Sequence, residues 1–216
     1  MSFFQRNREA LAKRGIDPSR LPPGQYSTDR FPVLHVGSVP RYAPDLSDWS
    51  LRIWGLVDRP QELSWADVQA LPQVEVTVDI HCVTKWSRFD MPWTGVRLRD
   101  LFDLAGVQAG ATHVLQHAEG GYTTNTPLAD LLGDDCLLAF GYDGHPLEPD
   151  HGYPARTFVP HLYFWKSAKW LRGLELLDHD VWGFWEQNGY HMRGEPWLEE
   201  RYGRPDPARM RRGPRR

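Results

Sequence analysis

Apolar and polar residues alternate most regularly from Val74 to Ile80, where a valine or isoleucine occupies every second position. A period of two is typical of a β-strand with one buried face. Cys82 continues the apolar positions, so we expect its side chain to point inward or into the floor of a pocket. Residues 84–93 are rich in polar side chains, interrupted by tryptophans, and are predicted to form a loop. Apolar residues then recur at helical spacing over 98–105, and Gly106 stands where that helix would end.

Similar patterns predict the other elements of a mixed α+β fold, built from β-sheets with short helices. Residues 49–55 alternate like a strand, and Ser64 with Asp67 forms the pattern of a helix capping box. A content of 18 prolines is typical of many loops and short strands rather than of a helical bundle. Further strands are predicted at residues 113–117, 122–126, 136–140 and 158–160, and a short helix at 128–132.

Changes in composition divide the chain into four segments. Residues 1–24 are predicted to be an N-terminal arm that begins as a short charged helix or a loose segment. Residues 25–180 carry the strand patterns and form the main domain. Residues 181–203 are an aromatic extension packed on this domain, either as a cover over a cleft or as a strap on the core. Residues 204–216 are basic and proline-rich, which predicts a disordered tail.

Length and charge narrow the class of protein. A chain of 216 residues with 41% hydrophobic residues suits one domain with a real core. The net charge of -3 argues against general nucleic-acid binding. Two cysteines in strand-like contexts do not suggest a disulfide framework. With no signal peptide and no apolar stretch of membrane-spanning length, we expect the protein to work in the cytoplasm.

Cys82 is the main candidate for chemistry, because the end of a strand gives its side chain a fixed direction. The residues alone leave three alternatives open: a small buried hydrophobic residue, a nucleophile, or a metal ligand. The last two require the thiolate form, and Lys85 and Arg88 could supply positive charge nearby.

A second candidate is cationic. Arg156, Lys166 and Lys169 lie near a serine, and together they could hold a phosphate or another anion. The alternative is a solvated basic surface.

Two ordered sets of short motifs stand out. The first is H-C-V at residues 81–83, followed by Trp86 and by W-T-G-V-R-L at residues 93–98. The second continues through L-L-A (137–139), D-G-H-P-L (143–147), D-H-G-Y-P (150–154), Arg156, V-P (159–160) and K-W-L (169–171). In their order and spacing these motifs resemble the sulfite oxidase-type molybdopterin-binding fold, over roughly residues 25 to 178.

The resemblance implies the cofactor and its ligands. Cys82 is then the thiolate ligand of molybdenum, because a soft thiolate suits a soft, redox-active metal. Arg88 and His117 are candidates for the mouth of the substrate site. The residues expected to contact the molybdopterin, besides Cys82, are Leu34, His35, His151, Arg156, Ser167, Ala168 and Lys169.

The resemblance also implies a reaction, which is two-electron oxygen-atom transfer on a small sulfoxide, N-oxide or sulfite-class substrate. The motif C-V-x-x-W-S at residues 82–87 is more similar to the catalytic subunit of the bacterial methionine sulfoxide reductase than to sulfite oxidases, whose arginine-rich run is replaced here. We see neither a haem domain nor an immunoglobulin-like dimerisation domain, so a separate electron-transfer partner is expected. The pattern does not indicate an oligomeric state.

Two other functions remain open at this point. A cofactor-free thiol enzyme would use Cys82 together with a histidine. A non-catalytic binding module would use the aromatic residues of 181–203 as its partner surface.

Overall fold

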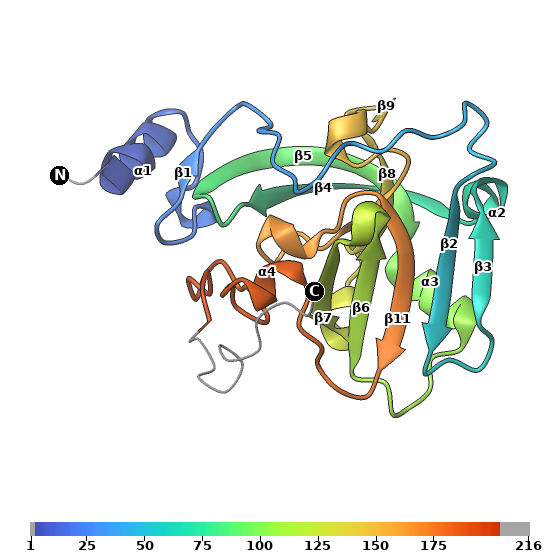
Figure 1. Cartoon of the computed structure of the whole chain (residues 1–216). Helices are drawn as coiled ribbons and strands as arrows, with labels where there is room; N and C mark the ends of the chain where they lie inside the picture. Colours follow the sequence, from blue (N-terminus) through green and yellow to red (C-terminus); the bar gives the residue numbers. More distant parts are fainter. Residues whose placement is uncertain (1–2, 204–216) are drawn as a thin grey trace.

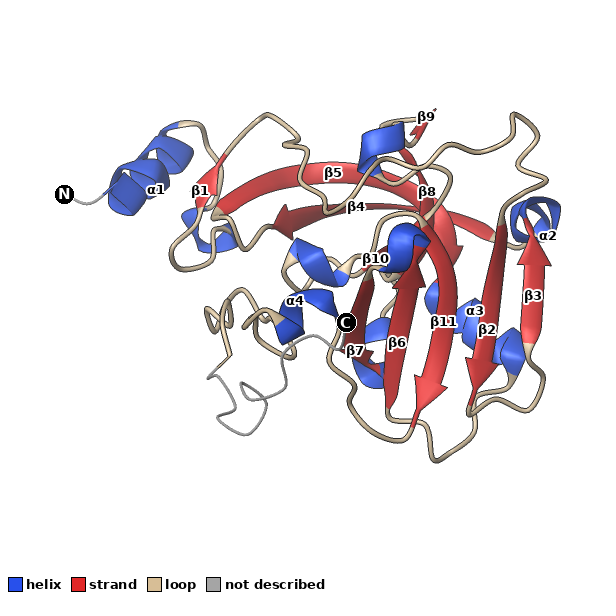
Figure 2. Ribbon diagram, viewed as in Figure 1, coloured by secondary structure: helices blue, strands red, loops and turns tan. Residues whose placement is uncertain are grey.

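The computed structural model describes residues 3–203, and these form two β-sheets with short helices between and beside them (Figures 1 and 2). This arrangement confirms the predicted mixed α+β fold. The disordered tail predicted for residues 204–216 lies outside the described residues. Across 3–203, none of the helices combines the length and the apolar character that crossing a membrane would require.

The first sheet carries the strand that leads to Cys82. Its central strands form a long curved hairpin, which crosses the upper part of the molecule in Figure 1. The hydrogen-bonded order is β1 (Tyr26–Ser27), β5 (Trp86–Arg97), β8 (Leu137–Tyr142) and β10 (Arg156–Phe158), with β4 (Gln73–His81) on β5 and β9 (His145–Pro146) on β8.

The second sheet stands beside and below this hairpin. Its middle strand, β11 (Leu171–Leu177), pairs in parallel with β2 (Ser50–Gly55) and antiparallel with β6 (His113–Ala118), which places segments far apart in the chain side by side. The order is β3 (Gln61–Ser64), β2 (Ser50–Gly55), β11 (Leu171–Leu177), β6 (His113–Ala118) and β7 (Thr123–Pro127).

The helices are short and begin and end where local sequence signals stand. Ser64 and Asp67 make the predicted reciprocal capping box, and Gly106 ends the helix over 98–105 in the left-handed conformation at φ 68°. The α-helices are α1 (Phe3–Lys13), α2 (Trp65–Ala70), α3 (Leu98–Ala105) and α4 (Phe184–Gln187). The 3₁₀ helices are η1 (Pro18–Arg20), η2 (Glu119–Gly121), η3 (Leu128–Leu131), η4 (Pro149–His151) and η5 (Phe164–Lys166).

The loop predicted for residues 84–93 is wrong, because most of it belongs to strand β5. The chain reverses in a tight turn in which Lys85 N–H donates to the Cys82 carbonyl and Cys82 N–H donates to the Trp86 carbonyl, both at 2.9 Å. Lys85 adopts φ 79° in this turn. Beyond this turn, Met91 and Trp93 are buried on alternate positions, which is the period of two of a strand. The charged residues of the same stretch made this period hard to recognise in the sequence.

Close packing of β5 against β8 depends on Gly95. A Cβ atom at this position would collide with the Leu138 carbonyl oxygen and would lie 2.9 Å from Cα of Ala139. Gly110, in contrast, has no heavy atom within 4 Å of where its Cβ would stand. The two glycines therefore form a matched pair for testing the sheet.

We predict that Gly95→Ala lowers the free energy of unfolding by about 1–3 kcal/mol, because the two backbones must move apart. Gly110→Ala should change it by no more than about 1 kcal/mol, in the stabilising direction, since alanine restricts the unfolded chain. Urea titration of both variants and the wild type measures the difference. Equal stabilities for the two variants would contradict the close contact between β5 and β8.

Candidate functional site

Cys82 follows β4 directly and is held by the turn to β5. Its side chain is buried, with 8% of the residue exposed, and its sulfur accepts a hydrogen bond from Thr84 Oγ1 at 3.1 Å. The carbonyl of Cys82 accepts from Gln25 Nε2 at 3.0 Å. Burial raises the pKa of the thiol, whereas Thr84 and the positive charges of Arg201 and Lys169 oppose that rise. The sulfur is thus fixed in direction, and the hydrogen bond that it accepts from Thr84 would also stabilise a thiolate.

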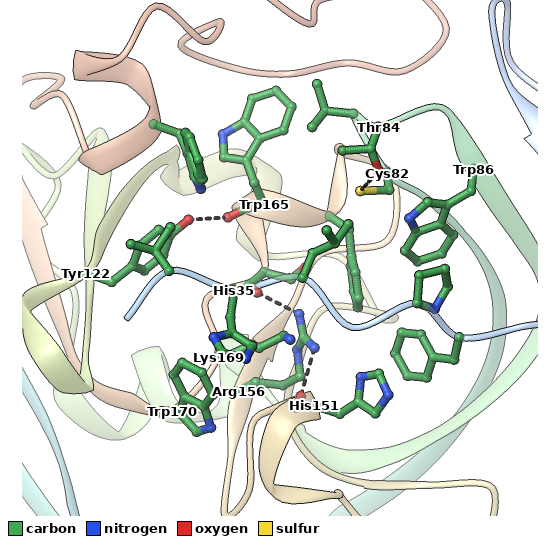
Figure 3. A pocket seen from close by; sticks show the side chains of 18 of the residues that line it. His35, Cys82, Thr84, Trp86, Tyr122, His151, Arg156, Trp165, Lys169 and Trp170 are labelled. Carbon is green, nitrogen blue, oxygen red and sulfur yellow. Dashed lines mark hydrogen bonds between the residues drawn. The ribbon is translucent and has the colours of Figure 1, made fainter. Parts of the chain in front are cut away.

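A cavity of about 290 Å³ opens in front of Cys82 (Figure 3). The structure brings most of the predicted site residues to its wall. Those that line it are Leu34, His35, Cys82, His151, Arg156, Ser167 and Lys169. Ala168 is buried next to the wall, and its N–H donates to Thr157 Oγ1 at 2.7 Å.

Arg156 lies in this wall as a buried cation. Its guanidinium donates to the carbonyl oxygens of His151 at 2.9 Å and Ser167 at 2.7 Å. The ring of Phe164 lies over it, with the centroid 4.1 Å from the guanidinium carbon. Burial lowers the pKa of Arg156 to about 9. Within residues 3–203 no carboxylate forms an ion pair with Arg156, so its charge is oriented by carbonyl groups but not neutralised.

Lys169 supplies a second positive group, and its ammonium donates to the Asp150 carbonyl. Burial, with a further contribution from the charge of Arg156, lowers the pKa of Lys169 to about 7. No ion pair with an acidic side chain is found for Lys169 in the described part of the chain either. Two cations that face a cavity without a partner anion are what a phosphate or another bound anion requires.

His151 is the third polar group at this end of the cavity. Its ring stacks on Phe31 with centroids 3.8 Å apart, and its buried Nδ1 has no hydrogen-bond partner among the described residues. Burial lowers the pKa of His151 to about 4, with the charges of Lys169 and Arg156 adding to the effect. The imidazole is therefore neutral near pH 7, and its Nδ1 is a buried polar atom left without a partner by residues 3–203.

Three residues considered from the sequence lie elsewhere. The guanidinium of Arg88 is 5.8 Å from the ring centroid of Phe31, and Arg88 does not line the cavity. His117 also lies outside it, and its Nε2 is 2.9 Å from Glu175 Oε2. The anion-binding role considered for Lys166 is wrong, because its ammonium is fully buried in an ion pair with Glu186 at 2.6 Å.

Sequence reasoning missed two aromatic residues of the cavity wall, Trp185 and Tyr190. The aromatic density of residues 181–203 predicted either a cover over a cleft or a strap on the core, and no local pattern indicated which rings would line the cavity. Phe31 was also missed, since nothing in its neighbourhood predicts a stack on a histidine 120 positions later in the chain.

Comparison of the sequence with known proteins identifies the family to which the chain belongs. Residues 36–185 match the oxidoreductase molybdopterin-binding domain. The chain belongs to this family of molybdopterin-dependent oxidoreductases. It is 54% identical to the uncharacterized oxidoreductase YuiH of Bacillus subtilis over 183 residues, which cover 85% of this chain and 92% of that protein.

More distant relatives carry the same domain within longer chains. Sulfite oxidase of Arabidopsis thaliana is 27% identical over 76% of this chain and 50% of its own length. The protein-methionine-sulfoxide reductase catalytic subunit MsrP of Gluconobacter oxydans is 29% identical over 70% of this chain and 55% of its own length. The sulfane dehydrogenase SoxCD of Paracoccus pantotrophus shares the fold, with a TM-score of 0.60 at 23% identity over 73% of this chain and 46% of that chain.

The residues of the cavity fit a molybdopterin. A thiol that can bind a soft metal stands at one side, and Figure 3 shows Arg156, Lys169 and His151 grouped on the other. The two cations match the phosphate of the cofactor, and the free Nδ1 of His151 matches a polar edge.

We predict that the cofactor-free protein binds sulfate, whose charge is constant near neutral pH, more tightly at about pH 6 than at about pH 8.5, because Lys169 loses its proton between them. At the lower pH, Lys169→Met should bind sulfate about tenfold more weakly. The measurement is the melting temperature against sulfate concentration at constant ionic strength. A pH dependence that persists unchanged in Lys169→Met would exclude Lys169 as its source.

Proposed function

We propose that this protein catalyses two-electron oxygen-atom transfer on a small substrate, at a molybdenum ion held by Cys82. The observation that carries the proposal is a single fixed thiol facing a cavity whose other side holds two cations without an acidic partner among residues 3–203. A soft thiolate is a suitable ligand for a redox-active metal, and metal binding deprotonates a coordinating thiol outright. Coordination would therefore overcome the rise in pKa that burial imposes on Cys82.

Each of the following residues at the cavity then has a defined role in binding the cofactor or shaping the site. Thr84 donates a hydrogen bond to the sulfur of Cys82 and holds its direction. Arg156 and Lys169 bind the phosphate of the molybdopterin, and His151 offers its neutral ring to the pterin. The cofactor, when bound, supplies the redox centre at which the oxygen atom and two electrons are exchanged. Leu34, His35 and Ser167 complete the wall and exclude water.

The proposed substrates are a sulfoxide, an N-oxide or sulfite. For a sulfoxide, two electrons and two protons convert R₂SO into R₂S and water, which balances the reaction. The electrons come from a separate carrier, for which a reduced viologen dye substitutes in the assay.

A cytoplasmic location is part of the proposal. It rests on Cys82 and Cys136, which are both free thiols in the structure.

A cofactor-free thiol enzyme is less well supported. Such an enzyme needs a base beside its thiol, and the group that contacts the sulfur of Cys82 is the hydroxyl of Thr84. Burial raises the pKa of Cys82, which also opposes a reactive thiolate without a metal.

We predict about one molybdenum per chain in protein purified from a host that makes molybdopterin, and loss of most of it in Cys82→Ser. Cys136→Ser is the matched control, because Cys136 is also a buried cysteine and does not line the cavity. Elemental analysis of the three proteins measures the effect, with sulfoxide reduction as a second readout. Retention of full metal and activity in Cys82→Ser would show that another group binds the molybdenum.

A further inference from the structure

The segment 181–203 forms one wall of the cavity, although most of it lies beyond the part of the chain that matches the family. Its half-buried rings Trp185 and Tyr190 pack together with centroids 4.8 Å apart. Tyr190 also meets Trp165 edge to face at 5.2 Å. Three aromatic rings from two separate segments therefore make one continuous surface, and this surface lines the same cavity as Cys82.

This wall is held in place at its start. The ion pair between Lys166 and Glu186 is inaccessible to solvent, and Glu186 also accepts from Trp165 Nε1 at 2.8 Å. Lys166 donates further to the side-chain oxygen of Asn125 at 2.9 Å. Removing one partner of a buried, hydrogen-bonded pair is strongly destabilising, so this end of the segment is a fixed part of the structure.

The far end of the segment is tied to the neighbour of Cys82. Arg201 donates to the carbonyl of Val83 at 2.8 Å and to that of Pro23 at 3.2 Å, and its guanidinium lies over the ring of Tyr163. Arg201 is buried and does not line the cavity. Its charge is thus used to hold the backbone and is not presented to a substrate.

The charge around Cys82 differs from that at the other side of the cavity. The side chains that line the wall near the sulfur are apolar or aromatic, apart from the hydroxyl of Thr84. The two cations of the wall, Arg156 and Lys169, are those proposed to bind the cofactor phosphate. Of the two cations whose charges act on Cys82, Lys169 is assigned to the cofactor phosphate and Arg201 is bound to backbone carbonyls. A small oxyanion at Cys82 would therefore leave water without a free cation to replace its hydration, which is unfavourable.

We infer that Trp185 and Tyr190 determine substrate specificity, and that they select neutral sulfoxides or N-oxides that carry a flat apolar group over small oxyanions such as sulfite. The inference rests on the proposed function and names its substrate class. An aryl group stacked against the wall gains apolar contact and favourable ring geometry, whereas a methyl group gains little of either. The fixed wall needs no reordering when the substrate binds.

The test compares methyl phenyl sulfoxide, dimethyl sulfoxide and sulfite with the holoenzyme, using reduced viologen as electron donor for the sulfoxides and an oxidised dye as acceptor for sulfite. We expect the wild type to prefer methyl phenyl sulfoxide. In Trp185→Ala, kcat/KM for this substrate should fall about tenfold, mainly through KM, with a change of about twofold or less for dimethyl sulfoxide. Tyr190→Ala should act in the same direction.

Trp197→Ala is the matched control, because this tryptophan belongs to the same segment, is 45% exposed and does not line the cavity. Calorimetric binding of methyl phenyl sulfone, which keeps the ring but is not reduced, gives a readout without turnover. Its affinity should fall about tenfold in Trp185→Ala and stay unchanged in Trp197→Ala.

Molybdenum content separates failure of the inference from failure of the proposed function. Normal molybdenum with an unchanged ratio of aryl to methyl turnover in Trp185→Ala would overturn the inference and leave the proposed function standing. A wild-type enzyme that prefers sulfite to methyl phenyl sulfoxide would also overturn the inference and leave the proposed function standing. If the wild type holds no molybdenum, the proposed function fails, and sulfone binding still decides whether Trp185 forms an apolar subsite.

Discussion

The cavity depends on one buried guanidinium. Arg156, at the start of β10, donates to the carbonyls of His151 and Ser167, so a single side chain joins two separate segments of the cavity wall. Its charge has no carboxylate partner in the described chain, and burial lowers its pKa to about 9. Desolvating a cation without an anion is unfavourable. A bound anion would relieve that penalty, so the stability of this region and the binding of the cofactor are coupled.

Two lysines three positions apart show how the fold separates structural from functional charge. Lys166, in η5, is fully buried and paired with Glu186, and it anchors the aromatic segment. Lys169 faces the cavity, where burial and Arg156 lower its pKa to about 7. The first charge is neutralised inside the protein, whereas the second remains available to a ligand. One short stretch of chain therefore fixes the wall and supplies the anion site.

The hairpin of β4 and β5 sets the direction of the Cys82 thiol, and segments distant in the chain form its surroundings. Strands β4 and β5 pair along their length, which prevents the turn that carries Cys82 from moving independently. The rings of Trp165, Trp185 and Tyr190 then pack on one another and form an aromatic part of the cavity wall. A rigid ligand position beside an aromatic wall would suit the proposed oxygen-atom transfer, because water that enters the site would compete for the metal and screen its charges.

Elements that depend on interactions between residues close together in the chain could be predicted from the sequence. The alternation before Cys82, the capping box at Ser64 and the helix that ends at Gly106 were predictable, since each follows from side-chain period or backbone conformation over a few residues. The family motifs also pointed to eight cofactor contacts, of which all but Ala168 line the cavity. Only the tertiary structure shows that β5 is a strand, because β4 and β8 supply the partners for its backbone N–H and C=O groups. It also placed Arg88 and His117 outside the cavity and Trp185 and Tyr190 in its wall. These outcomes depend on contacts between segments far apart in the chain, which no local pattern encodes.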